Sequence, residues 1–106
     1  MRAVLLAMLV VLATGCSREI GDECSSNTDC GENRICDLSQ KGGYCTITPC
    51  RPGDCPGEAV CVEFNKDTSY CMRACDGRRP CRTGYVCVTD FNGIEGFCDQ
   101  AQPPAE

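Results

Sequence analysis

The spacing of the cysteines constrains this chain more than any other feature. Twelve of its 13 cysteines form three rows of four, which begin at Cys24, Cys50 and Cys75. The gaps within a row are five, five and eight residues, then four, five and nine, then five, five and ten. A period of 26 and then 25 residues is typical of tandem repeats. The rows are Cys24, Cys30, Cys36 and Cys45; Cys50, Cys55, Cys61 and Cys71; and Cys75, Cys81, Cys87 and Cys98.

The rows also share residues other than cysteine. Three positions recur in each row: an aliphatic residue before the third cysteine, an aromatic residue before the fourth, and a small residue before that aromatic. Gly or Pro also occurs between the second and third cysteines of every row. The recurring residues are Ile35, Val60 and Val86; Tyr44, Tyr70 and Phe97; and Gly43, Ser69 and Gly96. Chance does not produce this agreement, so we predict three repeats spanning residues 24–49, 50–74 and 75–98.

Each repeat is predicted to be a loop followed by a short β-hairpin. In the third row, β-prone residues flank Asn92-Gly93, a strong two-residue hairpin turn. This turn places Phe91 opposite Ile94, Val88 opposite Phe97 and Cys87 opposite Cys98. The same counting places Val62 opposite Tyr70, with a three-residue loop at 65–67, and Asp37 opposite Tyr44. The predicted fold class is small and disulfide-rich, with little other regular secondary structure.

The pairing of the cysteines is less constrained than their spacing. Four cysteines allow three connectivities within each repeat, including a bridge straight across the hairpin. We favour the interleaved pattern, first to third and second to fourth, because it ties the preceding loop to the hairpin. Each such bridge stabilises the fold by about 3 kcal/mol for a loop of roughly 15 residues. The pairs are then Cys24–Cys36, Cys30–Cys45, Cys50–Cys61, Cys55–Cys71, Cys75–Cys87 and Cys81–Cys98.

The first row resembles the N-terminal cysteine-rich domain of Dickkopf proteins. The resemblance rests on Glu23-Cys24-SSNTD-Cys30-GENRI-Cys36, closed by Cys45 and followed by Cys50. It covers residues 23–50 best and residues 50–98 loosely. It implies the same local fold and interleaved pairing of the first four cysteines. The Wnt-antagonist role of that family is not carried over, because this chain begins with a bacterial-type signal.

Residues 1–15 have the layout of a secretory signal peptide. Met1-Arg2 is a short positive region, residues 3–13 are an unbroken apolar run, and Thr14-Gly15 supplies small residues before Cys16. An apolar run of 11 residues is too short to span a bilayer. We therefore predict an exported protein, which agrees with its cysteine content because disulfides persist outside the reducing cytoplasm.

Cys16 is the thirteenth cysteine and lies outside the repeat spacing. The segment from Ala13 to Cys16 resembles the lipobox of bacterial lipoproteins, although Ala13 stands where that family usually has Leu. The resemblance implies that Cys16 is lipidated and anchors the protein to a membrane, and Ser17 favours the outer membrane in a Gram-negative cell. The alternative is a soluble secreted protein with a free or intermolecularly paired Cys16.

The remaining sequence features are the two flanking segments, the charge balance, the aromatic content and a few charged residues in turns. Residues 16–23 are predicted to be a linker and residues 99–106 a disordered tail. After removal of the signal, 9 Lys and Arg residues face 15 Asp and Glu residues, which argues against nucleic acid. The six aromatic residues are too few for a large core. Asp29 and Asp54 are predicted to act in turns or caps, and Arg78, Arg79 and Arg82 to form an exposed basic turn.

No catalytic set is apparent in the sequence. The chain has no His, which excludes nucleophile–His constellations, and no Cys-x-x-Cys pair, which argues against zinc and redox centres. No metal site and no cofactor is predicted. The favoured function is a non-enzymatic envelope lipoprotein that presents loops to a protein or glycan partner. The alternative is a secreted, disulfide-rich inhibitor or toxin-like protein.

Overall fold

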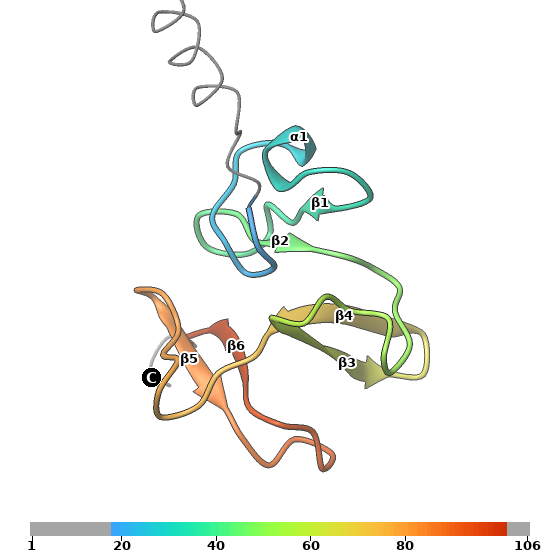
Figure 1. Ribbon diagram of the computed structural model, residues 1–106, viewed down its shortest axis with the longest axis vertical. Helices are drawn as coiled ribbons and strands as arrows, with labels where there is room; N and C mark the ends of the chain where they lie inside the picture. Colours follow the sequence, from blue (N-terminus) through green and yellow to red (C-terminus); the bar gives the residue numbers. More distant parts are fainter. Residues whose placement is uncertain (1–17, 102–106) are drawn as a thin grey trace, which may run out of the picture.

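The protein is a small disulfide-rich fold built from three short antiparallel hairpins. The computed structural model describes residues 18–101, in which each repeat contributes one hairpin (Figure 1). The signal peptide, Cys16 and residues 102–106 lie outside the described residues. The elements are α1 (Asn27–Cys30), β1 (Ile35–Cys36), β2 (Cys45–Thr46), β3 (Ala59–Asn65), β4 (Thr68–Arg73), β5 (Tyr85–Val88) and β6 (Phe97–Gln100).

The strand registers follow the sequence predictions, with one exception. The third and fourth cysteines of each repeat lie opposite each other, and so do Val62 and Tyr70, and Val88 and Phe97. Asn92 and Gly93 both have positive φ, at 50° and 73°, as a type I′ hairpin turn requires. The exception is the β3–β4 connection, predicted as a three-residue loop. It is shorter, because Asn65 pairs with Thr68 and a bulge between Glu63 and Asn65 absorbs the extra residue.

The loops before the hairpins use aspartates to satisfy backbone N–H groups. The Asp29 carboxylate accepts hydrogen bonds from the Ser25 and Ser26 N–H groups, at 2.8 and 3.2 Å, and so caps α1. Asp54 accepts a hydrogen bond from the Arg51 N–H at 3.0 Å. The predicted turn and capping roles of Asp29 and Asp54 are therefore confirmed.

Six disulfides join the loops to the hairpins, and they follow the interleaved pattern. Although the third and fourth cysteines of a repeat face each other across the hairpin, each bonds to a cysteine in the preceding loop. Within a repeat the two bridges therefore hold one loop against both strands of one hairpin. The bonded pairs are Cys24–Cys36, Cys30–Cys45, Cys50–Cys61, Cys55–Cys71, Cys75–Cys87 and Cys81–Cys98.

The recurring small residue lies against the first cysteine of its own repeat. A Cβ atom on Gly43 would lie 2.1 Å from the Cys24 carbonyl oxygen, and one on Gly96 would lie 2.6 Å from the Cys75 carbonyl oxygen. In the second repeat, the Ser69 hydroxyl instead bonds to the Cys50 N–H at 2.9 Å and to the Cys50 carbonyl at 3.0 Å. The hairpin and loop thus approach too closely for a larger side chain.

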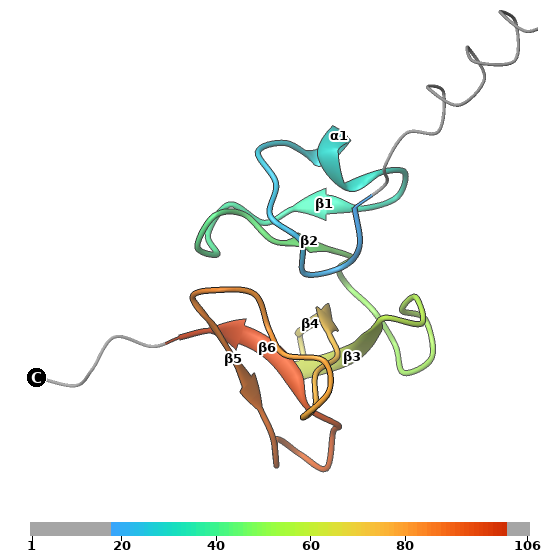
Figure 2. The same ribbon diagram turned by 60° about the vertical axis from the view of Figure 1, so that its left-hand side comes forward.

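The three repeats share one small core. The second repeat is central: the Cys71 N–H in β4 bonds to the Ile47 carbonyl of the first repeat at 2.9 Å, and Ala74 pairs with Phe97 of the third. Figure 2 shows the first hairpin packed over the other two. The buried residues of this core are Ile20, Tyr44, Cys50, Val62, Cys71, Met72, Tyr85 and Phe97.

Two predicted boundaries are wrong. Ile20 was assigned to a linker but is fully buried, and the Gly21 N–H bonds to the Cys45 carbonyl at 2.9 Å. The Cys45 N–H in turn bonds to the Asp22 carbonyl at 3.0 Å, so this segment runs beside β2 as part of the fold. At the other end, β6 includes Asp99 and Gln100, so the predicted tail starts too early. Within residues 18–101, no helix has the length and apolar character needed to cross a membrane.

Candidate functional site

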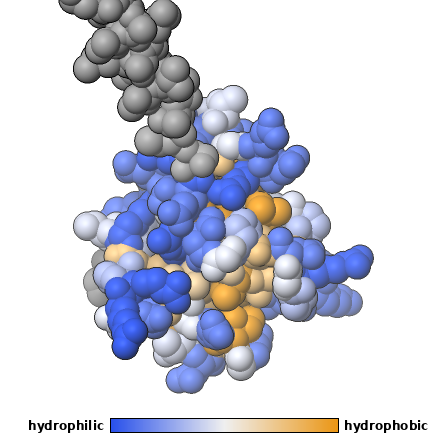
Figure 3. Space-filling view, viewed as in Figure 1, coloured by the Kyte–Doolittle hydropathy of each residue, from blue (hydrophilic) through white to orange (hydrophobic). Residues whose placement is uncertain are grey.

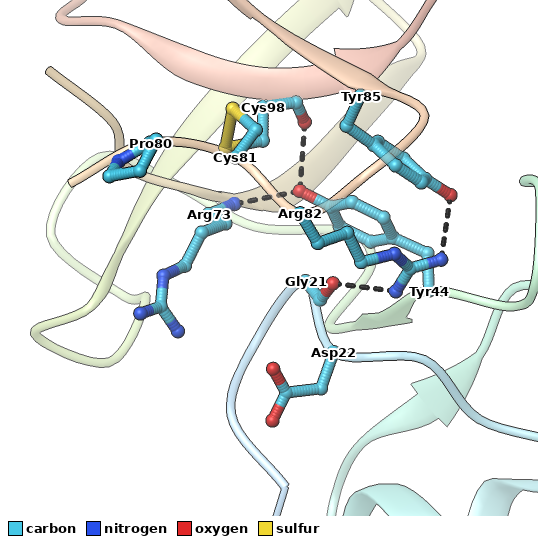
Figure 4. Close-up of a pocket in the computed structure, with 9 residues that line it drawn as sticks. All are labelled: Gly21, Asp22, Tyr44, Arg73, Pro80, Cys81, Arg82, Tyr85 and Cys98. Carbon is cyan, nitrogen blue, oxygen red and sulfur yellow. Dashed lines mark hydrogen bonds between the residues drawn. A yellow bond between two sulfur atoms is a disulfide. The ribbon is translucent and has the colours of Figure 1, made fainter.

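Two hollows lie where the repeats meet, and the ring of Tyr44 lines both. The first is a cavity of about 210 Å³, drawn in Figure 4. The Tyr44 hydroxyl donates a hydrogen bond to the Cys98 carbonyl at 2.9 Å and accepts one from the Arg73 N–H at 2.9 Å. One phenol of the first repeat thereby bonds to backbone of the second and of the third.

Arg82 holds the third repeat onto the first. Its guanidinium lies over the Tyr85 ring, 4.3 Å from the ring centroid, and donates to the Gly21 carbonyl at 2.8 Å. It also donates to the carbonyls of Lys41 and Gly43. A planar guanidinium with five donors suits such a set of carbonyl acceptors and an aromatic face.

The prediction of an exposed basic turn is therefore wrong for Arg82, which is partly buried. It holds for Arg78 and Arg79, which are exposed beside Asp76. The Asp76 carboxylate accepts hydrogen bonds from the Arg78 and Arg79 N–H groups at 2.7 and 2.9 Å. The sequence does not reveal the difference, because the carbonyl acceptors of Arg82 are 39 to 61 residues away along the chain.

The first hollow is a structural junction. Burial raises the pKa of both Tyr44 and Tyr85, so the two phenols, which are protonated at neutral pH in any case, hold their protons further into the alkaline range. For Tyr85, the nearby Arg82 guanidinium lowers the pKa, whereas Asp99 and Asp37 raise it. The Tyr44 hydroxyl and the Arg82 guanidinium are both bonded to backbone groups of other segments. Such an arrangement fixes the repeats in place and leaves little bonding capacity for a ligand.

The second hollow, which we call the three-repeat groove, is better suited to a ligand. Its volume is about 330 Å³, and all three repeats contribute to it. The loop before β2 forms one wall, the β3–β4 hairpin forms another, and the end of β6 completes it. The lining residues are Asp37, Ser39, Gln40, Tyr44, Thr46, Phe64, Thr68, Tyr70, Met72, Asp99 and Gln100.

The groove combines an apolar floor with oxygen-rich walls. Tyr44, Thr46 and Met72 are buried beneath it, and the half-buried rings of Phe64 and Tyr70 stand side by side, 6.2 Å between centroids. The carboxylates of Asp37 and Asp99 supply negative charge. Ligand sites are usually more apolar than this groove, in which polar residues outnumber apolar ones, so the groove suits a ligand with both a charged or polar group and an apolar part. Figure 3 shows that the face it views is largely hydrophilic, with apolar atoms gathered from its centre downward.

The cysteines predicted as site residues have structural roles in the described part of the chain. Three sulfur atoms come within 4.8 Å of one another in each repeat, as the two bridges of a repeat lie side by side. These sulfurs are in disulfides, which lack the thiolate character that metal binding needs. Cys16, the predicted lipidation site, lies outside the described residues.

The sequence indicates only some of the residues that line the two hollows. The repeat alignment singles out Tyr44 and Tyr70, but no sequence signal marks Phe64, Asp37 or Asp99 as neighbours. Comparison of the chain with protein-family models, curated proteins and solved structures found no match.

Proposed function

We propose that this chain is an exported, non-enzymatic lipoprotein that is anchored through Cys16 and binds a protein or glycan partner at the cell envelope. The disulfide-stapled scaffold carries the binding surface, and the three-repeat groove is the surface best suited to the task. The single observation that carries the binding role is this groove, because its aromatic and carboxylate groups come from three separate repeats.

Export and anchoring are supported by the sequence. A signal-like segment precedes Cys16, and removal of Cys16 from the count leaves twelve cysteines, the number engaged in the six disulfides. Acyl chains on Cys16 give durable membrane attachment, since each buried methylene contributes about 0.8 kcal/mol. The absence of His from the whole sequence supports a non-enzymatic role.

Intact mass of the native protein tests this proposal. The expected species begins at Cys16, carries a diacylglycerol on that residue and gains twelve alkylations only after reduction. Cell fractionation is expected to place it with the envelope membranes. The matched control is Cys16→Ala, which removes the thiol that accepts the lipid and keeps the repeats, so this variant is expected to lose membrane attachment.

Two results would contradict the proposal. An unlipidated wild-type species in the culture medium would replace the anchored protein with a secreted one, as an inhibitor or toxin-like protein requires. Twelve thiols that react with alkylating agent before reduction would remove the disulfide scaffold on which the binding surface depends.

A further inference from the structure

The three-repeat groove carries negative charge that no cation of the described residues neutralises. Within residues 18–101, the ion pairs are Arg34–Glu58, Arg73–Glu19 and Arg79–Asp76, and none involves Asp37 or Asp99. One oxygen of Asp37 accepts bonds from the Ser39 N–H and hydroxyl, at 3.0 and 2.6 Å. One oxygen of Asp99 accepts from the Gln100 N–H at 2.9 Å. The second oxygen of each carboxylate accepts no hydrogen bond from residues 18–101.

Tyr44 links the two backbone segments that carry these carboxylates. The Asp37 N–H bonds to the Tyr44 carbonyl at 2.9 Å, whereas the Tyr44 hydroxyl bonds to the carbonyl of Cys98, the residue before Asp99. Because Tyr44 is buried and held at both ends, it restrains the backbone of Asp37 relative to that of Asp99, and bonds from Ser39 and Gln100 restrain one oxygen of each carboxylate. Such a site is preorganised, so a ligand does not have to order it.

Arg82 and Lys41 are the cations of the neighbouring segments, and within residues 18–101 neither forms an ion pair with Asp37 or Asp99. The Arg82 guanidinium bonds to carbonyls on the junction side of Tyr44, and the Lys41 side chain lies beside Gly84. The groove wall also contains the Gln40 amide, whose oxygen is covered and has no hydrogen-bond partner within residues 18–101.

The aromatic wall suits the stem of a long side chain. Phe64 lies edge-on to Tyr70 and also contacts Phe91 and Phe97, at centroid distances of 5.8 and 6.0 Å, so its ring is held in place. A basic side chain has an apolar stem that packs on such rings and a charged head that aromatic faces and carboxylates attract. The groove presents both features to one ligand.

We infer that the three-repeat groove binds a basic side chain of a partner protein, with the cationic head between Asp37 and Asp99 and the stem against Phe64 and Tyr70. This inference rests on the proposed function and names the partner class. A neutral glycan could also stack on the rings. It would cover two carboxylates without compensating their charge, which is unfavourable in a partly desolvated site.

The test measures binding of short blocked peptides to the full oxidised protein by NMR titration. The probe is acetyl-Gly-Gly-Arg-Gly-Gly-amide, and its control replaces arginine with citrulline, which has nearly the same shape and no charge. We expect the arginine peptide to shift the amide signals of groove residues in a saturable way, and the citrulline peptide to bind at least about fivefold more weakly.

Two variants locate the binding. Asp99→Asn is expected to weaken the arginine peptide about fivefold. Asp67→Asn, which removes the same charge from the exposed β3–β4 turn, is expected to leave binding unchanged.

Equal binding of the citrulline peptide, no shift with either peptide, or equal effects of the two variants would overturn the inference. Maltotriose, a neutral glycan probe, gives the remaining arm: saturable maltotriose binding without arginine-peptide binding also overturns it. The lipidation and disulfide results are independent of all these outcomes.

Discussion

Tyr44 and Tyr70 occupy the same position in the first and second repeats and have opposite roles. Both precede the fourth cysteine of their repeat. Tyr44 is 1% exposed, and its hydroxyl bonds to two other repeats. Tyr70 is half-buried on the wall of the three-repeat groove. The first repeat therefore uses this aromatic residue to assemble the core, and the second leaves it half-exposed on the wall of the three-repeat groove.

The difference shows that the neighbours of a residue, and not its place in the repeat, set its role. The first hairpin lies over the other two, so its aromatic side chain points into the shared junction. Tyr70 projects from β4 beside Phe64, where the loop of the first repeat only partly covers it. A stack of identical repeats would bury or expose all three aromatics alike.

Truncation of the two tyrosines gives the largest expected contrast. Tyr44→Ala is expected to lower the free energy of unfolding by about 3–5 kcal/mol, since it leaves a cavity at a fully buried site. Tyr70→Ala is expected to cost less than half of that. Denaturant unfolding of the oxidised proteins, followed by circular dichroism, measures both. Equal losses would show that Tyr44 has no special place in the core.

The glycine before Tyr44 gives the next effect. Gly43 has a φ of 79°, and a Cβ there meets the Cys24 carbonyl. Gly43→Ala is expected to destabilise the fold by about 3 kcal/mol, at the upper end of the range for backbone strain. The control is Gly57→Ala, where a Cβ meets nothing within 4 Å and the change is expected to be nearly neutral. The same unfolding assay compares them, and a neutral Gly43→Ala would contradict the close approach.

Removal of the two hydroxyl groups tests the hydrogen bonds alone. Tyr44→Phe leaves the Cys98 carbonyl and the Arg73 N–H without their shared partner, so we expect a loss of about 1–3 kcal/mol. Tyr70→Phe removes a hydroxyl that makes no hydrogen bond to the described residues, and the expected change is close to zero. The comparison fails if the two variants have the same unfolding midpoint.

The smallest effect concerns alkaline pH. Burial raises the pKa of Tyr44, so the folded protein keeps this phenol protonated at a pH where the unfolded chain has lost the proton. Above the ordinary tyrosine pKa of about 10, the unfolded state therefore binds fewer protons, and the free energy of unfolding falls as pH rises. A pH series of unfolding midpoints is expected to fall more steeply above about pH 10 for wild type than for Tyr44→Phe. Parallel curves would show that Tyr44 does not contribute.

Local features were predictable because their causes lie within a few residues. Asn92-Gly93 determines its own turn, and the positions of Cys87 and Cys98 follow from it. The bulge in β3 was not predictable, because it depends on the pairing that β3 and β4 adopt together. The burial of Ile20 was missed for a similar reason: a short polar segment looks like a linker until a neighbouring strand offers it hydrogen bonds.

The groove was the least predictable feature. Asp37, Tyr70 and Asp99 belong to three different repeats, and no pattern in the sequence links them. Arg82 shows the same limit, since a basic residue among other basic residues gives no sign that it will bond to distant carbonyls. Side-chain partners far apart in the chain are set by how the repeats pack, and the spacing of the cysteines does not specify that packing.

The sequence by itself determined the three repeats, their hairpins and the positions where a small residue recurs, because turns and cross-links act over short stretches of chain. Only the tertiary structure decided which of these aromatic residues is fully buried and which is left half-exposed on the wall of the groove. The physical reason is that burial depends on which surfaces come into contact. Here those surfaces belong to different repeats, and their order along the chain does not specify how they pack in space.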